Sequence, residues 1–188
     1  MLSGRRLDLL DPSALDVEIE DIAHGLARVA RWNGQTTGDH AFSVAQHSLV
    51  VTRIVAAMEP AFTARELCAA LLHDSPEYVI GDLISPFKAA VGLNYKAFEE
   101  KLLVAIYHRF GIGDIEPNIT AAIKRADIAA AYYEATLLAG FEPQEAERFF
   151  GRPELPQALE TELRTLTPHS TNEAQARFLD GFAKLCRF

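Results

Sequence analysis

Apolar residues recur along most of the chain at the spacing of an α-helix. In residues 44–58 they lie three and four positions apart, with the polar Gln46 and Arg53 between them. This spacing places one apolar stripe on an amphipathic helix. Similar patterns cover residues 94–113 and 119–140. The sequence therefore predicts several helices that pack their apolar faces together.

Two further helices are indicated by the residues that would begin them. Thr63 and Glu66, and likewise Ser170 and Glu173, form the pattern in which each side chain caps the other's backbone N–H group. We expect the first of these helices to begin at Thr63 and to point His73 inward. No alternating apolar and polar run is bounded by hairpin dipeptides. The sequence thus predicts an all-α fold, a bundle of helices.

Length, composition and charge narrow the class of protein. The 188 residues suit one hydrophobic core, so we expect a single domain over residues 1–188, with additional C-terminal helices in about 141–188. A formal net charge of −8 argues against long nucleic acids as partners but leaves room for a small anionic ligand. No run of 18 apolar residues could span a bilayer, and the N-terminal residues lack the pattern of a signal peptide. We therefore expect no membrane partner.

The cysteine content bears on the cellular compartment. Cys68 and Cys186 are too few for a disulfide framework, and they lack the spacing of a metal-binding knuckle. A reducing cytoplasm is the simplest setting for such a chain. The sequence therefore predicts a cytoplasmic protein.

Two polar residues lie on apolar helix faces and need an explanation. His47 belongs to the apolar stripe of its helix, where a core histidine bonded to a backbone carbonyl is one interpretation. Asp127 shares the face of Ile123, and an unpaired carboxylate there would cost roughly several kcal/mol. Some positive charge must face it. Lys124 and Arg125 could supply this charge as an ion pair, and a metal ion is the alternative.

A divalent cation would account for these residues together with the pair His73 and Asp74, which follows the apolar run 67–72. Two neutral imidazoles and two carboxylates form a mixed nitrogen and oxygen set. Such a set suits zinc, manganese, iron or cobalt rather than calcium. The sequence predicts one divalent cation whose ligands are His47, His73, Asp74 and Asp127.

The order of these ligands is also a family signature. A His, an adjacent His-Asp pair and a distant Asp in an all-helical chain resemble the HD-domain superfamily of metal-dependent phosphohydrolases. The surrounding motifs look like those of the YfbR-type 5'-deoxyribonucleotidases, and this resemblance covers about residues 24–140. The motifs are "RVARWNGQ" (28–35), "AQHS" (45–48), "HDSPE" (73–77), "GDLISPFK" (81–88), "NYKAFE" (94–99) and "KRAD" (124–127).

The resemblance implies a helical, usually homodimeric enzyme that removes the 5'-phosphate from deoxyribonucleoside monophosphates with a metal such as cobalt or manganese. It implies that Glu77 activates the attacking water. It makes Arg31 and Trp32 substrate contacts, Asp82 a contact near the sugar and Lys88 a phosphate contact. A small nucleotide is therefore the expected partner.

Several of these residues have other interpretations. Glu77 also fits a surface glutamate, and Trp32 fits a core aromatic residue. Pro76 removes a helix donor just before Glu77, which predicts that Glu77 begins a new turn. His40, seven residues before His47, fits a phosphate contact or an exposed cap residue.

Three classes of function are compatible with the sequence. The first is a nucleoside monophosphate phosphatase. The second is another HD hydrolase, such as a phosphodiesterase or a guanosine tetraphosphate hydrolase. The third is a non-enzymatic module that binds a nucleotide or a metal. The presence of Glu77 beside the four ligands favours an enzyme, because a binding module has no need of a general base.

Overall fold

The computed structural model of the chain describes residues 1–83 and 95–186. Within these ranges the secondary structure is helical apart from one isolated bridge between Ala30 and Ser43. The all-α prediction is confirmed for this part of the chain. Its elements are η1 (Ala14–Asp16), α1 (Ile19–Leu26), η2 (Arg31–Gly34), α2 (Val44–Met58), α3 (Ala64–Leu71), α4 (Glu77–Ile80), α6 (Tyr95–Arg109), α7 (Pro117–Leu137), α8 (Pro143–Phe150), α9 (Gln157–Leu163) and α10 (Thr171–Leu185).

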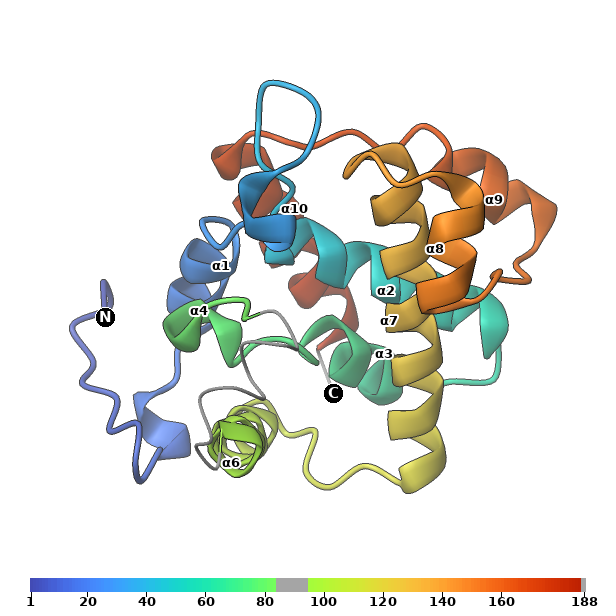
Figure 1. The fold of residues 1–188 in the computed structure, drawn as a ribbon. Coiled ribbons are helices and arrows are strands. Elements are labelled where there is room, and N and C mark those ends of the chain that lie inside the picture. The colour runs from blue at the N-terminus through green and yellow to red at the C-terminus, as the bar shows by residue number, and fades with distance from the viewer. Residues whose placement is uncertain (84–94, 187–188) are drawn as a thin grey trace.

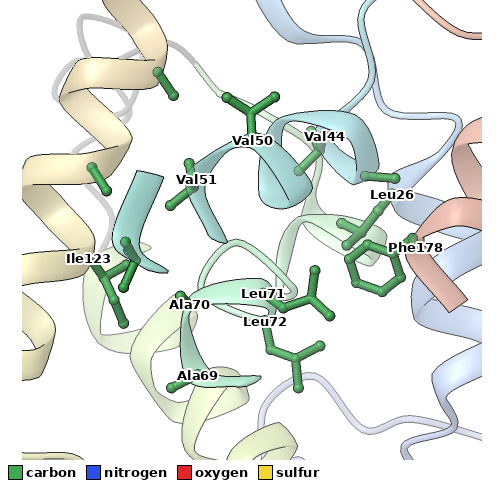
Figure 2. Close-up of a cluster of buried hydrophobic side chains, with 14 of the residues drawn as sticks. Leu26, Val44, Val50, Val51, Ala69, Ala70, Leu71, Leu72, Ile123 and Phe178 are labelled. Atoms are coloured by element: carbon green, nitrogen blue, oxygen red, sulfur yellow. The ribbon is translucent and has the colours of Figure 1, made fainter. Parts of the chain in front are cut away.

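The helix α2 lies at the centre of the fold and packs against α3, α7 and α10 (Figure 1). The long α7 forms one side, with α8 packed against it, while α1 packs against α4 and α10. Apolar side chains from α1, α2, α3, α7 and α10 meet in one buried cluster (Figure 2). Among them Leu26, Val51, Leu71 and Phe178 are completely buried. Burial of such side chains is the main stabilising contribution to this fold.

Capping side chains fix the starts of the helices. Thr63 and Glu66 form the predicted reciprocal cap of α3, and the Ser170 hydroxyl accepts the Glu173 N–H at the start of α10. The predicted extension of α3 to His73 is wrong, because the helix ends at Leu71. Pro76 lies five residues beyond that end, and a proline disfavours helical backbone in the residue before it and lacks an N–H donor. His73 therefore lies in a turn after the helix.

A disulfide joins Cys68 in α3 to Cys186, which directly follows α10. The two cysteines are 118 residues apart in the sequence, so nothing in their spacing indicated the pair. Stable disulfides are typical of oxidising compartments, so this bond does not favour the reducing cytoplasm that the cysteine count suggested. Across the described residues, no helix combines the length and the apolar character needed to cross a membrane.

Candidate metal centre

His47 is the buried centre of a group of polar side chains. It lies one turn into α2, whose start is fixed by the Ser43 cap, and its side chain is completely buried. Its Nε2 atom lies 3.3 Å from Asp74 Oδ2 and 3.3 Å from Asp127 Oδ1. Its Nδ1 atom lies 2.6 Å from Glu134 Oε1. His47 therefore links α2 to α7 and to the turn after α3.

His73 and Asp74 enter the group from that turn. His73 Nδ1 lies 2.8 Å from the Ala70 carbonyl oxygen, and its Nε2 lies 3.2 Å from Asp74 Oδ2. A carbonyl oxygen can only accept, so Nδ1 carries the proton in this bond. Nε2 is then the ring atom whose lone pair is available to a ligand. The turn thus presents one imidazole nitrogen and one carboxylate to the same point.

Asp127 comes from the middle of α7 and uses both of its oxygens. Oδ1 faces His47, whereas Oδ2 accepts a hydrogen bond from Lys124 Nζ at 2.7 Å. The ion pair that the sequence offered as an alternative therefore exists with Lys124, while Arg125 pairs with Glu59. The ion pair occupies one oxygen and leaves the other directed at the histidines. The two interpretations of Asp127 are compatible.

These donors fit a transition metal ion. The Nε2 atoms of His47 and His73 are buried and make no hydrogen bond of good geometry within the described part of the chain. Atoms bound at about 2.1 Å to one ion lie about 3.0 Å apart at octahedral and about 3.4 Å apart at tetrahedral angles. The donor separations of 3.2 and 3.3 Å fall between these values. One donor atom each from His47, His73 and Asp127 also lie within 4.8 Å of one another.

Glu134 contacts His47 at the ring nitrogen that faces away from Asp74 and Asp127, and no sequence pattern predicted a role for it. Its side chain is completely buried on α7, seven residues after Asp127 and on the same face. While Oε1 faces His47, Oε2 accepts from Arg31 Nε at 2.8 Å and from Trp32 Nε1 at 2.9 Å. A carboxylate that binds the outer ring nitrogen of a metal-ligating histidine fixes its tautomer and orientation. The seven-residue spacing from Asp127 was the available signal.

The charges within the group shift its pKa values strongly. Burial raises the pKa of Glu134, but Arg31 and His47 outweigh burial and bring the pKa to about 2. Burial and Arg31 lower the pKa of His47, yet Glu134, Asp127 and Asp74 together hold that pKa well above its ordinary value. The two histidines hold the pKa values of Asp74 and Asp127 below the ordinary range in spite of burial. The carboxylates are therefore ionised at neutral pH, as ligands of a cation must be.

The residues predicted to contact substrate differ in how close they lie to the candidate metal centre. Arg31 Nη1 lies 3.9 Å from Asp74 Oδ2 and 4.0 Å from Asp82 Oδ2, so both Arg31 and Asp82 are close to the centre. Trp32 packs edge-on against Phe141 and Phe150, at ring-centre distances of 5.6 and 6.1 Å. Lys88 lies outside the described residues.

The backbone at Trp32 is itself unusual, with φ at 55° in the left-handed region. A residue other than glycine is strained there, and such strain is concentrated at functional sites. The strained turn η2 brings the neighbouring Arg31 and Trp32 side chains to the same oxygen of Glu134. Trp32 is half-buried and lies outside the main hydrophobic core, and through Glu134 it contacts the candidate metal centre. Its role as a substrate contact stays a prediction.

Glu77 begins α4 as predicted, directly after Pro76 at the N-cap. Its side chain is buried, and its backbone N–H donates to the Asp74 carbonyl at 3.0 Å. Its role as general base stays a prediction. His40 is exposed and lies before the Ser43 N-cap of α2, so it is not on the helix that carries His47.

Comparison with known proteins places the chain in a family without assigning an activity. No family model matches the sequence. A protein of Rhodobacter capsulatus, described as uncharacterized, is 57% identical over 155 residues, which cover 82% of this chain and 79% of that protein. The chain belongs to its family. This relationship identifies neither a reaction nor a ligand for the chain. Any proposal about its function therefore depends on the chemistry of the site.

Proposed function

We propose that the protein is a metal-dependent phosphohydrolase of the HD type that removes the 5'-phosphate from nucleoside monophosphates. One observation carries the proposal. The Nε2 atoms of His47 and His73 are buried, make no hydrogen bond of good geometry within the described residues and lie 3.2–3.3 Å from the ionised carboxylates of Asp74 and Asp127, while each Nδ1 is engaged elsewhere. Buried polar atoms without a well-formed hydrogen bond are costly, and a cation bound by these nitrogens and carboxylates would remove that cost. The ordered ligand set and the surrounding motifs, which resemble YfbR-type 5'-deoxyribonucleotidases, supply the reaction.

In this proposal His47, His73, Asp74 and Asp127 hold one divalent cation. Manganese, cobalt, iron and zinc all suit two imidazoles and two carboxylates. When bound, such a cation polarises a phosphoryl oxygen and lowers the pKa of water. The protein is expected to act as a homodimer on a single nucleotide.

The remaining chemistry belongs to side chains of the protein. Water attacks phosphorus, the bond from phosphorus to the 5'-oxygen breaks, and the products are a nucleoside and inorganic phosphate. Glu77 accepts the proton of the attacking water. Lys124 and Arg31 contribute positive charge beside Asp127 and Asp74, where the phosphate would approach. Such fixed charges stabilise the developing negative charge of the transition state.

Phosphate release with added manganese or cobalt tests the proposal directly. The substrates are a deoxyribonucleoside 5'-monophosphate, its ribonucleotide and its 3'-monophosphate, with a cyclic dinucleotide and guanosine tetraphosphate as alternatives. We expect hydrolysis of the 5'-monophosphates, with the deoxy form preferred because Asp82 disfavours a 2'-hydroxyl. Equal rates on the ribo and deoxy forms would remove the sugar preference alone. Hydrolysis of only the cyclic dinucleotide or the tetraphosphate would assign the protein to another class of HD hydrolase, and metal binding without any hydrolysis would indicate a binding module.

A further inference from the structure

A cavity of about 480 Å³ opens onto the candidate metal centre between α6 and α7. One face of each helix lines it, because the lining residues follow the helical spacing of three and four positions. The segment 113–115 and three metal-ligand candidates, His73, Asp74 and Asp127, also line it. The helical lining residues are Glu100, Leu103, Val104 and Tyr107 on α6 and Thr120, Ile123, Lys124 and Asp127 on α7.

The lining combines apolar walls with charged groups. The apolar walls include Leu103, Tyr107 and Ile123, which are buried or half-buried. The Tyr107 hydroxyl is engaged, because it donates to the Ala69 carbonyl at 2.9 Å. Two exposed charged side chains, Glu100 and Lys124, also line the cavity, and Lys124 is bonded to Asp127. The buried and half-buried walls therefore favour flat apolar surfaces and offer few groups that could form hydrogen bonds with the edge of a base.

The contacts of Trp32 bear on which apolar surface could hold the base of a nucleotide. The indole ring packs against two phenylalanines, and its N–H is bonded to Glu134. Trp32 does not line this cavity, so the cavity offers a second apolar surface beside the candidate metal centre. A volume of about 480 Å³ is within the usual range for small-molecule sites, roughly 300–1,000 Å³.

We propose that the cavity between α6 and α7 binds the nucleoside part of the substrate, with the base held against Leu103 and Ile123. This inference rests on the proposed function and adds the substrate-binding residues to it. Lys124 lines the cavity beside Asp127, so it lies near a phosphate placed at the metal-ligand candidates. Because the walls contact the faces of the base rather than its edge, different bases bind similarly.

Paired substitutions test this subsite. Leu103→Asn replaces an apolar wall with a polar group of similar size, and Val104→Asn does the same at a cavity position that is 48% exposed and therefore tolerant. Ile128→Asn is the matched control, since Ile128 is 38% exposed on α7 and does not line the cavity. We expect Leu103→Asn to raise the KM for a deoxyribonucleoside 5'-monophosphate about tenfold. The same variant should change KM for glycerol phosphate, which lacks a base, by less than about twofold.

A second measurement uses deoxyadenosine without phosphate and the metal-free protein. Saturation-transfer NMR should show transfer to the base protons in the wild type and in Ile128→Asn, and a weaker signal in Leu103→Asn and Val104→Asn. Unchanged KM and unchanged transfer in both cavity variants would overturn the subsite, even with the phosphatase activity intact. If the wild type hydrolyses no monophosphate, the proposed function fails, and the nucleoside measurement still decides whether the cavity binds a base.

Discussion

Replacing Glu134 by glutamine tests the support of the metal centre with almost no change in volume. The carboxylate accepts from three donors, His47 Nδ1, Arg31 Nε and Trp32 Nε1, at 2.6, 2.8 and 2.9 Å. An amide has a single oxygen, and its nitrogen can only donate. Glutamine can therefore satisfy either His47 or the pair Arg31 and Trp32, but not all three.

The less costly arrangement directs the amide oxygen at Arg31 and Trp32 and the amide nitrogen at His47. His47 Nδ1 must then accept, which moves its proton to Nε2 and blocks the atom that faces Asp74 and Asp127. We expect metal affinity to fall by roughly 10- to 100-fold, as for other residues that orient metal ligands. Loss of the charged bond should lower the free energy of unfolding by about 1–3 kcal/mol. In a chain of this size that loss corresponds to a melting temperature lower by roughly 2–12 °C.

Manganese or zinc titration by calorimetry and thermal unfolding with a chelator measure the two effects separately. Glu59→Gln is the control, because Glu59 pairs with Arg125 at 2.7 Å on the partly exposed surface. That pair should contribute no more than about 1 kcal/mol and should leave metal affinity unchanged. If Glu134→Gln binds metal and melts like the wild type, Glu134 does not orient His47.

Four further changes have expected outcomes. Asp127→Ala should abolish metal binding, and full metal content by elemental analysis would disprove its assignment as a ligand. Glu77→Ala should retain metal and substrate affinity while turnover falls by about 10²-fold or more, and near-normal turnover would exclude Glu77 as the base. Because its carboxylate neighbours hold the pKa of His47 above the ordinary value, metal must displace a proton. Affinity should therefore fall roughly tenfold per pH unit on acidification, and titrations that are flat with pH would contradict this. Cys186→Ser should lower the free energy of unfolding in urea by about 2–5 kcal/mol in non-reducing buffer, and an unchanged value would mean that the disulfide does not stabilise the fold.

Local sequence rules predicted the helices well because each depends on neighbouring residues. The apolar period of 44–58 matches α2, and Thr63 with Glu66 marks the start of α3. The predicted end of α3, at His73, was wrong because apolar periodicity alone does not show where a helix stops and the chain turns. Pro76 correctly predicts that Glu77 begins a new turn, because its effect on the backbone is local.

The candidate ligands were also predictable, since polar residues on apolar faces are conspicuous and their order matched a known pattern. The supporting contacts were not, because they join distant parts of the chain. Arg31 and Glu134 are 103 residues apart, and the two cysteines are 118 residues apart. No local pattern encodes such pairs, and only the packed fold brings them together. The cavity between α6 and α7 likewise depends on how two helices are placed.

The position of α10 in the chain determines when the protein can mature during its synthesis. This helix packs against α1, α2 and α3, all of which leave the ribosome earlier. Until α10 emerges, the apolar surface near Leu26 that Phe178 covers is exposed to solvent (Figure 2). Contacts between such distant segments form slowly, and nascent chains with exposed apolar surface are clients of chaperones. His73 and Asp74 directly follow α3, so their final placement waits for the same event. The candidate metal site is therefore expected to form only after translation of α10, although α2, α3 and the turn with His73 and Asp74 are made earlier.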